Sequence, residues 1–238
     1  MPINNITNVI RKFRAKYSAR KYKNLTPQQI FEKIYQKGAW GLSEDPLQPF
    51  FSGRGSHADV IVSTYLNAVQ DFLSGFIEKP SVVDLGCGDF SVGSKIRHLC
   101  GKFTACDVVT KLIEFNRVKY KNLDIDFRVL DLTTNDLPSG DIVFIRQVLQ
   151  HLSNEQILSA LPQISLKYKF LVLTEHLPNA EIIIHNLDKM AGPDIRLNNK
   201  SGIVLTSPPF NLRPKSERML CQVKEGQGVI TTTLYELN

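Results

Sequence analysis

Ser81-Val-Val-Asp-Leu-Gly-Cys-Gly-Asp89 decides the fold of this chain. The apolar run from Val82 to Leu85 ends at two glycines, Gly86 and Gly88, which let the backbone approach a ligand closely and adopt unusual φ/ψ values. A helical pattern over residues 92–99 follows. This order predicts a strand that delivers a loop to the carboxyl edge of a sheet, where the ligands of open α/β sheets bind.

Strand and helix patterns alternate beyond this loop. Further strands are expected at residues 103–109, 125–130, 142–146 and 170–174, and helices at residues 111–120 and 154–164. Such alternation predicts right-handed βαβ units and an α/β fold with a parallel sheet covered on both faces. The strand patterns of residues 219–223 and 229–237 predict a C-terminal antiparallel hairpin.

Two helices are expected before the first strand. One begins at Thr26-Pro27, a capping residue followed by proline at the first helical position. The other runs from His57 to about Phe76, and its expected buried side is Val60, Ile61, Tyr65, Leu66, Val69 and Phe72. The chain therefore divides into a basic arm (1–24), a helical cap (25–78) and a main domain (79–238), with an acceptor or lid segment at about 177–211.

The positive charge of the chain is concentrated in the arm. Residues 1–24 contain seven of the 29 Lys and Arg residues and no acid, which leaves 22 cations against 23 acids in the remainder. Ile6, Val9, Ile10, Phe13 and Tyr17 form one apolar stripe of a helix. The arm is expected to be a surface helix packed on the body, a helix at an anionic membrane surface through residues 6–23, or a nucleic-acid contact. The neutral body counts against nucleic acid.

Composition narrows the class of protein further. No apolar run approaches the roughly 20 residues that cross a bilayer, and no signal peptide is visible. The four cysteines lack CxxC spacing and are typical of reduced thiols, so no structural zinc site is expected, while the use of another metal stays open. The expected location is the cytoplasm, with the inner face of the membrane as an option.

Two cofactor classes use a glycine loop of this kind. A dinucleotide fingerprint requires a third glycine at position 91, where this chain has Ser91. Asp84 stands where a dinucleotide-binding strand carries an apolar residue, and an acid there suits a ligand with an ammonium group. Asp107, at the end of the second strand, can accept both hydroxyls of a ribose. The expected cofactor is therefore S-adenosylmethionine.

Residues 79–175, with Asp84-Leu-Gly-Cys-Gly88, resemble the core of class I S-adenosylmethionine-dependent methyltransferases. The segments 31–35, 38–41 and 52–56 resemble a bacterial subgroup found near genes for surface polysaccharides. The resemblance implies a Rossmann-like, mostly parallel seven-stranded sheet and an N-terminal helical extension. It also implies that Trp40 and the 52–56 loop fold over the methionine end of the cofactor. The expected cofactor-binding residues are Trp40, Gly53, Gly55, Ser56, Asp84, Gly86, Cys87, Gly88, Asp107, Val108, Asp131, Leu132, Arg146 and Gln147.

The acceptor of the methyl group is expected on the far side of that cofactor. A hydroxyl nucleophile must lose its proton, and histidine is best matched to neutral pH. His151 follows the fourth strand and is the first candidate base; His176 is the second. Glu175, Asp194 and Arg196 are candidate contacts of a polar acceptor. The expected activity is O-methylation of a small polar or saccharide acceptor, free or lipid-linked. The alternatives are methylation of RNA or other nucleic acid through the arm, and an inactive cofactor-binding protein.

Overall fold

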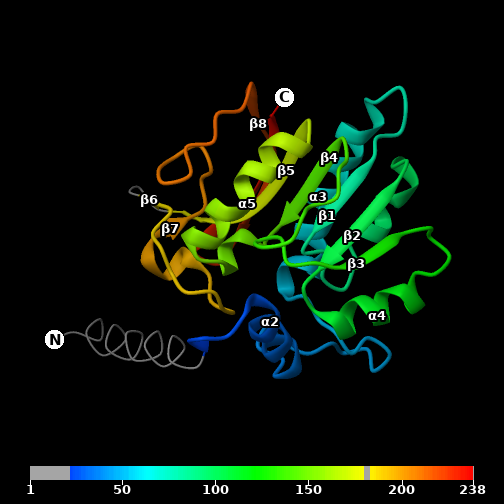
Figure 1. Cartoon of the computed structure of the whole chain (residues 1–238), viewed down its shortest axis with the longest axis horizontal. Coiled ribbons are helices and arrows are strands. Elements are labelled where there is room, and N and C mark those ends of the chain that lie inside the picture. Colours follow the sequence, from blue (N-terminus) through cyan, green and yellow to red (C-terminus); the bar gives the residue numbers. More distant parts are fainter. Residues whose placement is uncertain (1–21, 180–182, 238) are drawn as a thin grey trace.

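The computed structural model describes residues 22–179 and 183–237, so residues 1–21 of the expected arm lie outside the described residues. Seven strands form one sheet in the order β3-β2-β1-β4-β5-β9-β8 (Figure 1). They are β1 (Val82–Leu85), β2 (Phe103–Asp107), β3 (Asp126–Val129), β4 (Ile142–Arg146), β5 (Phe170–Pro178), β8 (Ser216–Glu225) and β9 (Gly228–Glu236). The strands β1 to β5 are parallel, while β9 runs antiparallel to β5 and β8. The expected Rossmann-like methyltransferase fold with its C-terminal hairpin is confirmed.

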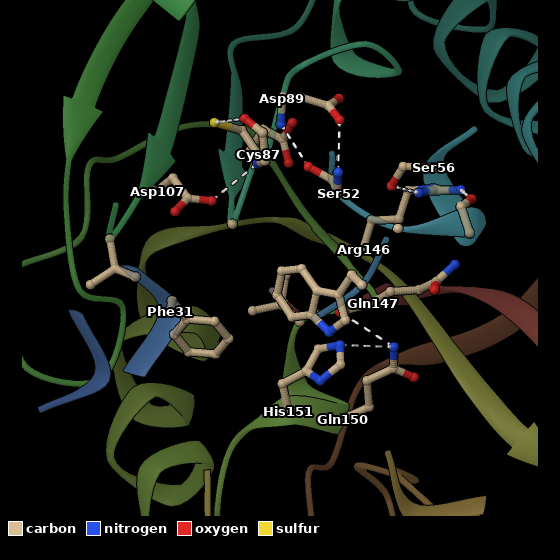
Figure 2. A pocket seen from close by; sticks show the side chains of 18 of the residues that line it. Phe31, Ser52, Ser56, Cys87, Asp89, Asp107, Arg146, Gln147, Gln150 and His151 are labelled. Carbon is tan, nitrogen blue, oxygen red and sulfur yellow. Dashed lines mark hydrogen bonds between the residues drawn. The ribbon is translucent and has the colours of Figure 1, made fainter. Parts of the chain in front are cut away.

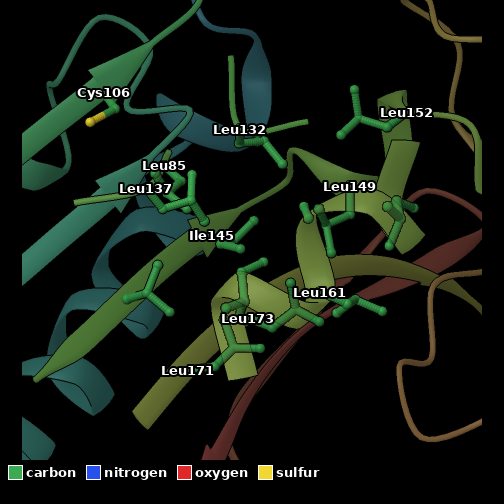
Figure 3. Close-up of a cluster of buried hydrophobic side chains, with 14 of the residues drawn as sticks. Leu85, Cys106, Leu132, Leu137, Ile145, Leu149, Leu152, Leu161, Leu171 and Leu173 are labelled. Atoms are coloured by element: carbon green, nitrogen blue, oxygen red, sulfur yellow. The ribbon is translucent and has the colours of Figure 1, made fainter. Parts of the chain in front are cut away.

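Side chains of the central strands alternate between two hydrophobic cores, because successive residues of a strand point to opposite faces. In β4, Val143 and Ile145 belong to one core, and Ile142 and Phe144 to the other. Figure 3 shows the first core, where α5 (Asn154–Lys167) packs on the sheet. Helix α2 (Pro27–Gln36) joins this core, α3 (Asp59–Ser74) covers the opposite one, and α4 (Thr110–Lys119) contributes to both.

The starts of two helices follow directly from the sequence. Thr26 and Gln29 form a capping box at α2, with each side chain bonded to the other residue's backbone N–H, and Pro27 occupies the first turn. Ser153 and Gln156 form the same arrangement at α5. At the start of each helix, the capping side chain therefore binds a backbone N–H that has no partner inside the helix.

Three expectations about local structure were wrong. Residues 92–99 are not one helix but two 3₁₀ turns, η2 (Gly93–Lys95) and η3 (Arg97–Leu99), neither of which has a side-chain cap. Val60 is exposed, because the buried side of α3 is turned toward Val62. Strand β5 extends to Pro178 because β9 pairs with it along its whole length. None of the described helices has the length and apolarity of a bilayer-crossing segment.

Candidate active site

A cavity of about 420 Å³ opens at the carboxyl edge of β1, β2 and β4 (Figure 2). It is bounded by the glycine loop after β1, by residues 52–57, which we call the strap, and by the turn η4 (Leu149–His151). All of the residues expected to bind the cofactor line this cavity, and so do His151, His176 and Asp194. Glu175 and Arg196 do not.

The glycine loop follows the expected design. Gly86 and Gly88 have φ values of 78° and 55°, the left-handed region that favours glycine. A Cβ on Gly88 would lie 2.4 Å from Ser52 Oγ, so the strap can approach the loop only at a glycine. The Gly88 N–H donates to Asp107 (3.1 Å), and Asn116 Nδ2 donates to the Gly88 carbonyl (2.8 Å). The loop is thus fixed from β2 and α4.

The strap is attached to the glycine loop by contacts that the sequence argument did not identify. The buried Asp89 carboxylate accepts the Ser52 N–H (3.0 Å) and lies 2.7 Å from His57 Nε2, while Ser52 Oγ accepts the Asp89 N–H (2.8 Å). These bonds lower the pKa of Asp89 to about 2, despite its burial. The glycine motif includes Asp89, but the spacing of 32 residues between His57 and Asp89 does not predict that their side chains meet.

Arg146 holds the other end of the strap. Its guanidinium donates to Ser56 Oγ (3.0 Å) and to the Gly55 carbonyl, and its Cζ lies 4.9 Å from the centre of the Tyr65 ring. Within the described chain, the buried Arg146 Nε and Gln147 Nε2 have no hydrogen-bond partner. Two unsatisfied donors on adjacent residues are suited to an anionic group of a ligand.

Two buried carboxyl groups give the cavity its acidic character. Burial raises the pKa of Asp84 to about 7, although the positive charge of Arg146 opposes that shift. Burial also raises the pKa of Asp107 to about 6, against the backbone N–H groups of Val109 and Gly88 that stabilise its charged form. A cationic group placed beside Asp84 would favour its ionised form.

His151 lies in the cavity wall as an uncharged side chain. Its Nδ1 lies 3.2 Å from the Gly192 carbonyl, which can only accept, so Nδ1 carries the proton and Nε2 does not. Burial, reinforced by the positive charge of Lys189, lowers the pKa of His151 to about 3. The imidazole is therefore a weak base held in its neutral form, and its role as the base stays a prediction. Gln150 Nε2 lies 3.4 Å from His151 Nε2.

His176 and Asp194 occupy the rim of the cavity. His176 lies within β5, and its Nε2 donates to the Glu225 carbonyl (3.1 Å) at the β8–β9 turn. Burial lowers its pKa. Asp194 is exposed and follows Pro193, whose carbonyl accepts a hydrogen bond from Trp40 Nε1 (3.3 Å). Both residues are accessible to a ligand in the cavity.

Arg196 was expected to contact the acceptor, and the structure corrects this. It is 1% exposed and donates to the carbonyls of Leu149, Gln150 and Leu152, to that of Leu187, and to Asn154 Oδ1. All of its donor atoms are therefore occupied within the protein. Arg196 clamps the segment after β5, which includes β6 (Ile184–His185) and β7 (Ser201–Gly202), to the η4 turn.

Glu175 was also expected to contact the acceptor, but it points to the opposite face of β5 from His176. It is 3% exposed and accepts the Leu149 N–H (3.1 Å). Its Oε2 has no partner in the described chain, and burial raises its pKa to about 8. The acid is therefore protonated at neutral pH and supports the base of the η4 turn.

Replacing Glu175 with glutamine should change how stability depends on pH. The folded pKa of Glu175 is above its unfolded value, so its contribution is fully present below about pH 4.5 and is lost as the pH rises through 8. Glu175→Gln removes this loss. The variant should therefore gain several kcal/mol relative to the unmodified protein between pH 5 and pH 9, at about 1.4 kcal/mol per pKa unit. Urea unfolding at each pH measures the difference. Glu78→Gln, at an exposed site, should show no such trend, and a flat difference for Glu175→Gln would contradict the assignment.

Comparison with known proteins supports a methyltransferase. Residues 82–166 match a family model described as a methyltransferase domain. The N-methyltransferase NodS from Bradyrhizobium japonicum WM9, solved with S-adenosyl-L-homocysteine, is similar at 15% identity (TM-score 0.58; 86% of this chain and 99% of that chain). Magnesium protoporphyrin IX methyltransferase (ChlM) from Synechocystis PCC 6803, solved with S-adenosylmethionine, is similar at 14% identity (TM-score 0.55; 90% and 99%). No curated protein sequence matches the chain.

Residues 82–166 therefore match a methyltransferase domain, and the chain has the fold of S-adenosylmethionine-dependent methyltransferases. One neighbour is named an N-methyltransferase and the other a magnesium protoporphyrin IX methyltransferase, so the fold leaves the acceptor to the residues around the cavity. Among the described residues, His, Cys, Asp and Glu side chains nowhere gather in a set of three that could hold a metal ion.

The donor and acceptor groups of the cavity fit this cofactor. Asp84 offers a carboxyl group to the ammonium, and the unsatisfied nitrogens of Arg146 and Gln147 offer donors to the carboxylate. Asp107 offers two oxygens to the ribose hydroxyls. Part of the wall beside Asp107 suits an adenine ring and its amino group, because it combines the apolar side chains of Val108, Leu130 and Leu132 with the acid Asp131.

Proposed function

We propose that the chain transfers the methyl group of S-adenosylmethionine to a hydroxyl of a small polar or saccharide acceptor, free or carried on a lipid. The observation that carries this proposal is the buried, neutral His151, whose unprotonated Nε2 belongs to the cavity wall. Neutral polar groups around it, and the exposed Asp194 at the rim, suit an acceptor that is rich in hydroxyl groups.

The bound cofactor supplies a methyl group on a sulfonium, an electrophile with a neutral leaving group. The chain's own residues then have to bind, orient and exclude water. Asp84, Arg146 and Gln147 hold the methionine end, Asp107 holds the ribose, and Asp131 meets the adenine amino group. The strap, tied down through Asp89 and Arg146, covers the methionine end and keeps water out.

His151 orients the acceptor rather than ionising it in advance. Its Nε2 accepts a hydrogen bond from the acceptor hydroxyl, replacing the long contact with Gln150 (3.4 Å). Nε2 would take the hydroxyl proton during methyl transfer, in which the methyl carbon–sulfur bond breaks as the carbon–oxygen bond forms and the hydroxyl becomes more acidic. A low pKa suits this late transfer, because the imidazole stays neutral beside a cationic cofactor.

The basic arm adds a second element to the proposal. For a lipid-linked acceptor, residues 6–23 would contact the inner face of the membrane, as their apolar stripe and cations suggest. Nucleic-acid methylation, the other role considered for the arm, would appear as salt-sensitive RNA binding that is lost on deletion of residues 1–24.

The test is methyl transfer from radiolabelled cofactor to a panel of glycosides and polyols, with total RNA as the competing substrate. His151→Asn should lower turnover of the accepted glycoside about 100-fold, the usual contribution of a proton acceptor. Affinity for S-adenosylhomocysteine, which carries no sulfonium charge, should stay within about twofold when measured by calorimetry. His185→Asn, at an exposed histidine outside the cavity, is the matched control. Methylation of RNA alone, or full turnover by His151→Asn, would contradict the proposal.

A further inference from the structure

We propose that Trp40 and Phe31, together with the neutral ring of His151, form a π-electron surface that recognises the positive charge of the sulfonium. The site would thereby distinguish S-adenosylmethionine from S-adenosylhomocysteine, its neutral product. The inference rests on the proposed function, since it assumes that the methionine end of the cofactor lies under the strap. It adds a specificity role for Trp40, which is expected to cover the cofactor, and for Phe31 and His151 beside it.

The rings form a continuous cluster on one wall of the cavity. The Trp40 ring centre lies 4.9 Å from that of His151 and 6.0 Å from that of Phe31, and the Phe31–His151 distance is 6.5 Å. Tyr35 packs edge-on against Trp40 at 5.3 Å. All four residues line the cavity. Figure 2 shows Phe31 and His151 across the cavity from Asp107 and the glycine loop.

Trp40 is fixed through its polar edge. Its Nε1–H donates to the Pro193 carbonyl (3.3 Å), and Tyr35 contacts it edge-on. The hydrogen bond and the Tyr35 contact together fix the orientation of the indole before a ligand binds. Tryptophan offers the strongest cation–π interaction of the aromatic side chains, and a preorganised, desolvated ring gains most from it.

The charges around this surface favour a cation. His151 is neutral, so it adds a ring and no competing positive charge. Arg54 and Arg146 also line the cavity, but Arg54 is paired with Glu225 (2.7 Å) and Arg146 is bonded to the strap and stacked on Tyr65. Asp84 and Asp107 supply negative charge on the opposite side. A sulfonium between these carboxyl groups and the rings is stabilised from both sides.

Such an aromatic surface could instead bind a flat acceptor molecule by stacking it on Trp40. Two members of the aromatic cluster, Phe31 and Tyr35, belong to helix α2. The Tyr35 hydroxyl is hydrogen-bonded to Ser52 Oγ of the strap (2.9 Å). Because Ser52 bonds to Asp89 of the cofactor loop, this cluster is coupled to the cofactor side of the cavity. The observations therefore favour the sulfonium over the acceptor.

Calorimetry with the two cofactor forms tests the inference without an acceptor. Trp40→Leu should weaken binding of S-adenosylmethionine about tenfold more than binding of S-adenosylhomocysteine, the size of a desolvated cation–π interaction. The ratio of the two dissociation constants cancels any general loosening of the site. Trp40→Phe should preserve most of the ratio. Leu132→Ala, on the adenine side, should weaken both ligands equally.

Equal weakening of both ligands by Trp40→Leu would overturn the inference and favour a stacked acceptor. If Trp40→Leu binds neither ligand, Phe31→Leu on the same surface provides the same ratio, and an unchanged ratio there overturns the inference as well. Failure of the unmodified protein to bind either ligand would instead contradict the proposed function. The two failures are therefore distinguishable.

Discussion

Replacing Arg196 with methionine is expected to lower the free energy of unfolding by about 3–5 kcal/mol, the range for removing one partner of a buried charged network. The guanidinium is 1% exposed and satisfies four backbone carbonyls and Asn154 Oδ1. Methionine fills the volume but leaves these oxygens buried without donors. Each such oxygen carries a desolvation penalty of about 1–3 kcal/mol, reduced where the segment can relax toward water.

Urea unfolding, followed by circular dichroism, measures the Arg196→Met effect. Arg128→Met is the matched control, because Arg128 is half exposed and its side chain bonds, within the described part of the chain, to the Asp126 side chain alone (2.9 Å from Nε). Its loss should therefore cost less than about 1 kcal/mol. If the two substitutions lowered the free energy of unfolding equally, the hydrogen bonds of Arg196 would not be what holds the segment to the η4 turn. Hydrogen exchange should locate the loosening at the η4 turn.

Replacing Asp107 with alanine is expected to weaken cofactor binding about 100-fold or more. One carboxylate oxygen accepts the Gly88 N–H (3.1 Å) and the other accepts the Val109 N–H (3.0 Å), which positions both oxygens at the end of β2. Two hydrogen bonds to ribose hydroxyls would then be charge-assisted, at about 1.5–3 kcal/mol each. Alanine removes these bonds and also releases the glycine loop.

Binding of S-adenosylhomocysteine, measured by calorimetry, tests the Asp107 prediction. Asp107→Asn keeps one oxygen and should give an intermediate loss. Asp136→Ala, at an exposed acid that pairs only with Lys167 in the described chain, should bind normally. Retention of tight binding by Asp107→Ala would remove the proposed ribose contact and, with it, the orientation of the cofactor.

Features encoded locally were predictable from the sequence. The glycines at 86 and 88 need positive φ, the capping boxes at Thr26 and Ser153 are read from four residues, and strand ends place Asp107 at the sheet edge. Each of these depends on a short stretch of chain. The residues expected to bind the cofactor line one cavity, because parallel strands bring their carboxyl ends to the same edge of the sheet.

The errors came from features that depend on distant parts of the chain. Glu175 and His176 are adjacent in sequence, yet the alternation of a strand sends them to opposite faces. Glu175 meets the Leu149 N–H and His176 the Glu225 carbonyl, and both partners are distant in sequence. The pairing of His57 with Asp89 depends on how the strap crosses the glycine loop. The low pKa of His151 comes first from its burial and then from the charge of Lys189, from the segment after β5.

The Arg196 clamp recognises the backbone of the η4 turn and not its side chains. Carbonyl groups are present whatever residues occupy positions 149, 150 and 152, so the attachment survives sequence change within the turn. Gln150, which faces the cavity from that turn, can therefore be exchanged without detaching the segment that carries Asp194. The backbone of the η4 turn holds the segment in place, while side chains of the turn face the cavity. Side chains of this turn are therefore suitable positions at which to redesign the enzyme for a new acceptor.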